Sequence, residues 1–158
     1  MESTDHSLFS ASHSPEFSRE VLPSEPYKEA VDVWLALAGI ESWGAWSKDI
    51  FSASHLDALP CGRGSRVRLN TSYGEEVWTV SYWLPGERLD LYREIGKVGI
   101  LRRFELEDPP SGEGVKLVLS YHRQASAVRK IVFAPALYLS RLRALKFFSD
   151  LNSHLCGE

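Results

Sequence analysis

Two arginines in an otherwise apolar pattern are the residues best suited to bind a ligand. Arg93 and Arg102 alternate in step with apolar neighbours in two consecutive strand-like runs, so both are predicted on the buried side of a sheet. A turn at Lys97-Val98 would set them directly opposite each other, and like charges in that position destabilise a sheet. A bound carboxylate or phosphate would compensate them, because guanidinium forks match such groups.

The same two arginines also have an explanation that needs no ligand. Glu76 is predicted diagonal to Arg93 on the same face and could neutralise it. Trp78, predicted opposite Arg93, could stack on its guanidinium with a gain of about 0.5–2 kcal/mol. Arginines near the rim of the sheet could also reach water. A ligand-binding pair and an internally paired cluster therefore both stay open.

Aromatic side chains accompany the arginines on the predicted inner side. The candidate ligand-binding residues are Trp78, Tyr82, Arg93, Arg102, Phe104, Tyr121 and Tyr138. Aromatic walls with polar tips suit a ligand with a hydrophobic body. A filled core uses the same residues, so the pattern does not decide whether the space between them is open.

No motif assigns a catalytic residue. The sequence has no G-x-S-x-G elbow, no H-E-x-x-H and no Cys/His cluster at zinc spacing, so neither a metal site nor a cofactor is expected. The glycine-rich turn at 62–64 is neither a P-loop nor a dinucleotide fingerprint. One acid–base hypothesis is Glu76 acting with Tyr73 and Tyr82 in a dry cavity, where burial raises the pKa of a carboxyl group.

Seven short alternating runs predict the strands that hold these residues. The first lies near 16–22. The others lie near 51–57, 65–73, 76–84, 87–95, 100–107 and 115–123, separated by turns rich in Gly and Pro.

Hairpin turns predict which residues face one another, because facing residues in an antiparallel pair have a constant sum of numbers. Turns at 74–75, 85–86 and 97–98 and the Pro-rich loop predict the pairs Thr71–Trp78, Tyr82–Leu89, Val80–Leu91, Leu91–Phe104 and Phe104–Leu117. All four hairpins then place their apolar residues on one common face, and a slip by one residue would turn a strand's apolar set to water.

The opposite face of this sheet is predicted to be solvated. It would carry Arg66, Arg68, Asp90, Glu105, Lys116 and His122.

Helices are predicted on both sides of the strand region. The first begins with Ser24 as its N-cap and ends at Gly39, and a short helix or turn follows at 40–46. The segment from about 126 to 155 follows the helical period, with a kink or loose first turn expected at Pro135.

The last predicted helix is strongly basic. It carries Arg129, Lys130, Arg141, Arg143 and Lys146. A basic helix with aromatic residues can lie on an acidic membrane. The simpler interpretation is that these charges form the solvated face of an amphipathic helix.

Composition limits the class of protein. With 158 residues, 44% of them hydrophobic, the chain has the length of one domain and enough apolar side chains for a core. We expect a disordered tail at 1–15 and one ligand-binding domain at 16–158. A net charge of −3 without charged blocks gives no indication of nucleic-acid binding. No secretory signal or transmembrane run is visible, and two cysteines are too few for a disulfide framework, so a cytoplasmic location is expected.

The predicted order of elements resembles the helix-grip fold of the START-like (SRPBCC, Bet v 1-like) superfamily, which includes polyketide cyclase/dehydrases and lipid-transport domains. The resemblance rests on the helical segment Val33–Leu37, the tryptophan-rich elbow Trp43–Trp46, and the glycine turns at 62–64 and 112–114. It covers roughly residues 16–155. It implies an α+β fold in which a curved antiparallel sheet of about seven strands wraps around a long C-terminal helix. The superfamily shares no single catalytic set, so no catalytic residue is transferred.

Three functions fit these observations. The first is binding or transport of a small hydrophobic ligand, which can be acidic, in a mostly apolar cavity between the sheet and the C-terminal helix. The second is an enzyme of the polyketide cyclase or dehydratase type. The third is a protein-interaction domain without a small ligand. The sequence leaves the ligand and the oligomeric state open.

Overall fold

The computed structural model describes residues 17–21, 29–125 and 127–157. The predicted tail at 1–15 and Ser24 lie outside these residues. The first helix begins at Ala30, after Glu29 in an extended conformation (φ −126°, ψ 121°), so the prediction that it begins after Ser24 is wrong.

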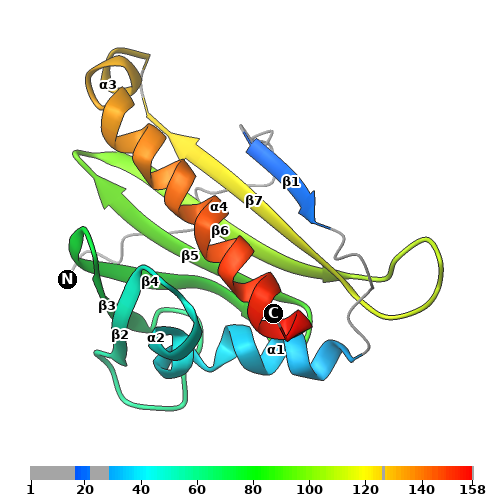
Figure 1. Ribbon diagram of the computed structural model, residues 1–158. Coiled ribbons are helices and arrows are strands. Elements are labelled where there is room, and N and C mark those ends of the chain that lie inside the picture. The colour runs from blue at the N-terminus through cyan, green and yellow to red at the C-terminus, as the bar shows by residue number, and fades with distance from the viewer. Residues whose placement is uncertain (1–16, 22–28, 126, 158) are drawn as a thin grey trace.

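A single antiparallel sheet forms one layer of the molecule (Figure 1). Its strands are β1 (Phe17–Val21), β2 (Ile50–His55), β3 (Arg66–Thr71), β4 (Gly74–Leu84), β5 (Arg88–Ile95), β6 (Val98–Glu107) and β7 (Lys116–Gln124). Strands β2 to β7 follow one another across the sheet, and β1 pairs with β7 at the far edge, giving the order β1-β7-β6-β5-β4-β3-β2. The chain therefore forms the predicted meander, with its first strand returned to the side of its last.

Helices cover one face of this sheet. They are α1 (Ala30–Ala38), the 3₁₀ turn η2 (Ile40–Ser42), α2 (Trp43–Trp46), α3 (Ala127–Val132) and α4 (Ala134–Cys156). In Figure 1, α4 runs along the strands of the curved sheet, and α1 lies beneath its C-terminal end. The α+β class and the helix-grip arrangement predicted from the sequence are confirmed.

The core lies between the inner face of the sheet and α4. Its most deeply buried members include Leu37, Trp43, Trp78, Leu89, Phe104, Leu117, Leu119, Tyr121, Leu137 and Leu151. Each large apolar side chain removed from water in this way contributes about 1.5–3 kcal/mol to folding. Side chains from α1, α2, the sheet and α4 share this one core. The position of α4 therefore depends on the inner face of every central strand.

The β5–β6 hairpin differs from the predicted register by two residues. The turn is Gly96-Lys97, so Ile95 pairs with Val98 and Leu91 pairs with Arg102. Both turn residues have a positive φ, 55° for Gly96 and 63° for Lys97, as a type I′ turn requires. Because a shift of two keeps every side chain on its face, the inner face is as predicted. The prediction that Arg93 and Arg102 lie directly opposite each other is wrong, since Arg93 pairs with Ile100.

Two other hairpins are also shifted by an even number of residues. In β3–β4 the turn is at 72–73, and Val67 rather than Thr71 lies opposite Trp78. In β6–β7, Leu119 rather than Leu117 lies opposite Phe104. The predicted facing pairs are wrong here, but the predicted faces are correct.

A β-bulge in β4 changes the face of one predicted site residue. The predicted pair Val80–Leu91 is present, but the register shifts between Val80 and Tyr82, so Tyr82 pairs with Asp90 and Trp83 with Leu89. An extra residue reverses the alternation that follows it. Trp83 now packs against Trp34 in an edge-to-face contact with ring centroids 5.3 Å apart. Tyr82 lies on the outer face, with 38% of its surface exposed.

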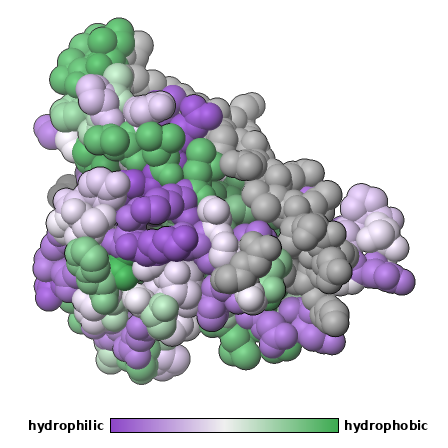
Figure 2. Space-filling model, viewed as in Figure 1, coloured by the Kyte–Doolittle hydropathy of each residue, from purple (hydrophilic) through white to green (hydrophobic). Residues whose placement is uncertain are grey.

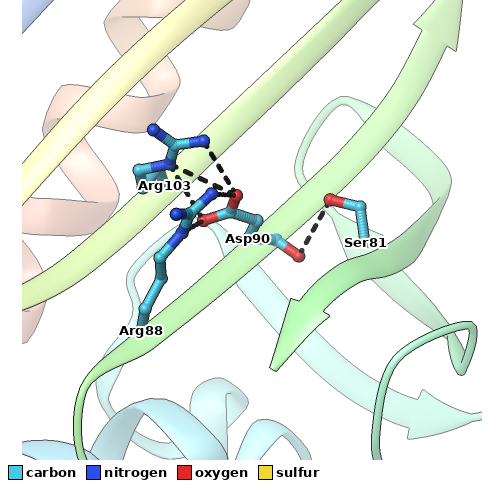
Figure 3. Close-up of polar contacts among 4 residues, drawn as sticks. All are labelled: Ser81, Arg88, Asp90 and Arg103. Carbon is cyan, nitrogen blue, oxygen red and sulfur yellow. Dashed lines mark hydrogen bonds and ion pairs between the residues drawn. The ribbon is translucent and has the colours of Figure 1, made fainter. Parts of the chain in front are cut away.

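Ion pairs secure this bulge on the outer face (Figure 3). The Asp90 carboxylate accepts hydrogen bonds from Arg88 at 2.5 and 2.9 Å and from Arg103 at 3.2–3.3 Å. Ser81, the extra residue, donates to the Asp90 carbonyl at 3.5 Å. The Arg88 guanidinium also lies 4.2 Å from the centre of the Tyr82 ring.

The prediction of a fully solvated outer face is wrong for half of its named residues. Asp90 is 2% exposed, and Lys116 and His122 are each 8% exposed. For Asp90 the reason is that the two arginine side chains cover it.

The predicted C-terminal helix is divided in two. Phe133 (φ −97°, ψ 10°) separates α3 from α4, and Pro135 lies in the first turn of α4, where its missing N–H needs no helical partner. A side chain added at Gly96 would come within 2.3 Å of the Phe133 ring. The start of α4 is therefore seated directly on the β5–β6 turn.

Replacing Gly96 should test this contact. Gly96→Ala adds a methyl group against the Phe133 ring at a residue with positive φ, so the free energy of unfolding should fall by about 2–3 kcal/mol in urea denaturation. Gly86→Ala is the matched control, because Gly86 has φ 79° and open space around it. It should lose only about 1 kcal/mol, which is the backbone cost alone. Equal losses in the two variants would mean that the ring contact is unimportant.

Candidate functional site

Three arginines gather around one buried carboxylate inside the sheet. Glu76 on β4 is 5% exposed, and it accepts a hydrogen bond from the indole N–H of Trp78 at 2.9 Å. Its other oxygen forms ion pairs with Arg93 of β5, at 2.9 Å, and with Arg143 of α4. We call Glu76, Trp78, Arg93, Arg102 and Arg143 the Glu76 cluster. It joins the middle of the sheet to the terminal helix.

Arg102 has the least compensated charge of the cluster. It is 7% exposed, and its Nη2 donates to the carbonyl of Ser140 on α4 at 3.3 Å. Its guanidinium lies 4.4 Å from the centre of the Trp78 ring, and that of Arg93 lies 5.7 Å from it. The two arginines are thus diagonal neighbours around one indole ring. A cation–π contact of this kind stabilises a guanidinium by about 0.5–2 kcal/mol.

The pKa values reflect this imbalance. Burial acts to raise the pKa of Glu76, but the Trp78 hydrogen bond and the arginine charges outweigh it and lower the pKa below 4.5. For Arg102, burial lowers the pKa to about 10, helped by the charges of Arg143 and Arg93 and opposed by Glu76. A buried cation with a lowered pKa costs the folded state on the order of 3 kcal/mol at neutral pH. Glu76 is therefore a stable anion, whereas Arg102 is a charge that the fold holds at a cost.

A small polar cavity adjoins the cluster. It has a volume of about 20 Å³, and its lining is Ser47, Asp49, Ile50, Leu69, Thr71, Glu76, Arg102, Arg143 and Phe147. This is room for about one water molecule. The prediction of a mostly apolar cavity is not confirmed at this place, because aromatic and aliphatic side chains fill the space between the sheet and α4.

Several polar atoms in the cavity wall have no partner among the described residues. They are the Nε atoms of Arg102 and Arg143, Asp49 Oδ2 and Ser47 Oγ. The other oxygen of Asp49 is held by Lys146 at 2.6 Å, and the Nη2 of Arg143 donates to Thr71 at 3.1 Å. Buried donors without acceptors are costly. The wall therefore offers two arginine N–H groups to an incoming acceptor.

The structure brings together most of the predicted site residues. Trp78, Phe104 and Tyr121 are each 1% exposed on the inner face, and Tyr121 donates to the carbonyl of Leu137 at 3.5 Å. Arg93 and Arg102 belong to the Glu76 cluster. Tyr82 lies on the outer face, and Tyr138 is 58% exposed on α4, so neither contributes to the site.

The acid–base trio suggested by the sequence is not assembled. Tyr82 lies on the opposite face, Tyr73 is 60% exposed, and the pKa of Glu76 is lowered rather than raised. A carboxylate that stays ionised among arginines is a poor general acid.

Arg143 is the site residue that the sequence analysis missed. The charge pattern predicts it on the solvated face of the last helix, but it lies beside Ser140 and Ala144, which are 4% and 1% exposed. Their spacing with Phe147 marks the inner side of α4, and this period could have indicated that Arg143 borders the core.

Other kinds of site find no support in the described part of the chain. Across residues 17–21, 29–125 and 127–157, no three His, Cys, Asp or Glu side chains gather as metal ligands would. Within the same residues, no helix combines the length and the apolar character needed to cross a bilayer.

Comparisons with known proteins support the fold. No protein-family profile matches the sequence, and a comparison with curated proteins gave no match. Among solved structures, protein MLL2253 from Mesorhizobium loti is 18% identical, with a TM-score of 0.60 over 89% of this chain and 96% of that one. The Zhui aromatase/cyclase from Streptomyces sp. R1128 is 14% identical, with a TM-score of 0.62 over 88% of this chain and 92% of that one. Ara h 8.0201 is also 14% identical, with a TM-score of 0.60 over 90% and 97%.

These neighbours agree with the resemblance seen in the sequence. The chain has the START-like, Bet v 1-like fold. At identities of 14–18% the likeness concerns the fold alone.

Neutralising Glu76 should destabilise the protein in a pH-dependent way. Because its pKa is lower in the folded state, Glu76 contributes stability above its ordinary pKa of 4.5, and this contribution is lost as the pH falls through the folded-state value. In urea denaturation, Glu76→Gln should lower the free energy of unfolding by about 3 kcal/mol at neutral pH. The difference from the unsubstituted protein should shrink below a pH of about 4.5.

Glu75→Gln provides the matched control for this prediction. The Glu75 side chain is 56% exposed and pairs with Arg68 on the surface at 3.4 Å. Its loss should change stability by less than about 1 kcal/mol. A Glu76→Gln deficit that persists unchanged in acid would contradict the assignment of Glu76 as the counterion.

Proposed function

We propose that this chain binds a small molecule that has an acidic head and a hydrophobic body, in the space between the sheet and α4. The observation that carries the proposal is the Glu76 cluster, in which Arg93 and Arg143 pair with the one carboxylate and Arg102 stacks on Trp78 without an ion-pair partner, beside a polar cavity. Guanidinium groups bind carboxylates and phosphates through charge-assisted hydrogen bonds. An anion in this cavity would supply the acceptor that the cluster lacks.

The acidic head would bind between Arg102 and Arg143. Both side chains line the cavity, and the Nε of each is buried without a partner among the described residues. An added negative charge would also relieve the burial cost of Arg102, whose pKa is lowered to about 10. Binding energy would thus come partly from the removal of a cost that the ligand-free protein bears.

The hydrophobic body requires that the interior open. The cavity measures about 20 Å³, whereas ligand pockets usually measure roughly 300–1,000 Å³. Ile50, Leu69 and Phe147 form the apolar part of the lining, so the body would enter beside them and displace them from one another. We therefore expect slow, closed-to-open binding rather than entry into a preformed pocket.

Calorimetry with a matched pair of probes tests this proposal. Decanoate should bind measurably, and decanol, which has the same chain without the charge, should bind at least roughly tenfold more weakly. Arg102→Met keeps the length of the side chain but removes the guanidinium, and it should weaken decanoate binding by roughly tenfold or more. Arg68→Met is the control, because the Arg68 side chain is 43% exposed and lies outside the cluster. Equal binding of the two probes, or unchanged affinity in Arg102→Met, would refute the proposal.

Arg102→Met should behave unusually in stability measurements. Most substitutions of buried residues destabilise a protein. Here the ligand-free variant should be as stable as the unsubstituted protein or more so, because a costly buried charge is removed. Thermal melting measures this. A loss of more than about 2 kcal/mol would indicate a structural role for Arg102.

Two other functions have weaker support. An enzyme of the cyclase or dehydratase type shares its fold with the aromatase/cyclase neighbour, but the acid–base residues considered for it do not meet. A protein-interaction domain without a small ligand would leave the unpaired arginine N–H groups of the cavity unexplained.

A further inference from the structure

The outer side of α3 and of the first half of α4 is apolar. Six side chains there are between 42% and 75% exposed, and we call them the α3–α4 stripe: Val128, Ile131, Val132, Tyr138, Leu139 and Leu142. Figure 2 shows hydrophobic atoms gathered over α3 and the adjoining part of α4, next to a hydrophilic band. The stripe runs along the helices at a spacing of three and four residues, which places its members on one side.

The stripe is not the side of α4 that packs on the sheet. The inner side carries Leu137, Ser140, Ala144, Phe147 and Leu151, all of them buried. The helix is therefore apolar on two sides in its first half, and the expected solvated polar face is present only in part. A contiguous exposed apolar surface on a folded domain usually marks an interaction site.

The charges on the helical segment that carries the stripe are of one sign. From 126 to 149 the sequence has no Asp or Glu and has five Lys or Arg, although the chain as a whole has a net charge of −3. Of these, Arg141 is exposed, Arg143 belongs to the Glu76 cluster, and Lys146 pairs with Asp49. Exposed Lys97 adds another positive charge, since the turn that contains it contacts Phe133 at the α3–α4 junction. The helical segment is thus apolar along the stripe and positive in its net charge.

We propose that the α3–α4 stripe docks on an anionic lipid surface. Helices that lie on membranes combine an exposed apolar side with flanking Lys and Arg, which attract anionic headgroups. Tyr138 is suited to the interface between headgroups and acyl chains, where aromatic rings with a polar tip gather. Charge decides against a second copy of this chain as the occupant, because a symmetric contact would bring two basic surfaces together.

This inference does not depend on the proposed ligand. The stripe lies on the exposed side of α4, and the Glu76 cluster meets the helix at the border of its buried side, where Arg143 follows Leu139 by one turn. A membrane contact at the stripe would nevertheless place the helix that closes the ligand space at the lipid surface.

Co-sedimentation of the full chain with vesicles tests the proposal. The protein should bind vesicles of phosphatidylcholine mixed with phosphatidylserine and bind phosphatidylcholine vesicles much more weakly, and added salt should weaken the binding. The double variant Ile131→Gln, Val132→Gln should lose at least roughly tenfold in affinity, because two side chains no longer enter the bilayer.

The double variant Val31→Gln, Leu35→Gln is the matched control. These two residues are 57% and 62% exposed, and they lie on α1 beneath the other end of α4. The control should bind like the unsubstituted protein, and circular dichroism melting should show both variants folded. Charge reversal at Arg141 should weaken binding to phosphatidylserine vesicles.

Three results would overturn the proposal. The first is no binding to either kind of vesicle. The second is binding that the stripe variant leaves unchanged. The third is a dimer in sedimentation equilibrium that the stripe variant dissolves, which would assign the stripe to a second copy.

Discussion

One buried carboxylate connects the two layers of this protein. Glu76 lies on a central strand, accepts a hydrogen bond from the indole N–H of Trp78, and pairs with Arg93 of the next strand and Arg143 of the terminal helix. Most of the remaining contact between the sheet and α4 is apolar and non-directional, apart from the hydrogen bonds of Arg102 to Ser140, Tyr121 to Leu137 and Arg143 to Thr71. The ion pairs of Glu76 are directional, so they fix the position of α4 along the sheet and its rotation about its own axis.

The single negative charge of Glu76 cannot neutralise all three arginine side chains around it. Arg102 stands over the Trp78 ring with a carbonyl for a partner, and its pKa is lowered to about 10. Replacing a buried charge by an apolar side chain often leaves stability unchanged or raises it. A buried, uncompensated charge beside a cavity destabilises the folded protein, and an anion bound in the cavity would offset that loss of stability. This is the physical basis of the proposal that the cluster binds an anion.

The two sides of the terminal helix α4 carry different groups. Its inner side supplies Arg143 and the Ser140 carbonyl to the cluster, while its outer side carries the exposed α3–α4 stripe. Its start rests on the β5–β6 turn through Phe133 and Gly96.

The sequence by itself determined the element order, the α+β class and the face of nearly every strand residue. It could do so because alternation has a period of two, and the hairpin errors of two or four residues leave each side chain on its face. Only the tertiary structure decided the rest: that Arg93 and Arg102 are diagonal, that Tyr82 turns outward, and that Arg143 turns inward. These outcomes depend on the Gly96-Lys97 turn, the bulge at Ser81 and the rotation of α4. Each of them is selected by packing between segments far apart in the chain, which no local pattern records.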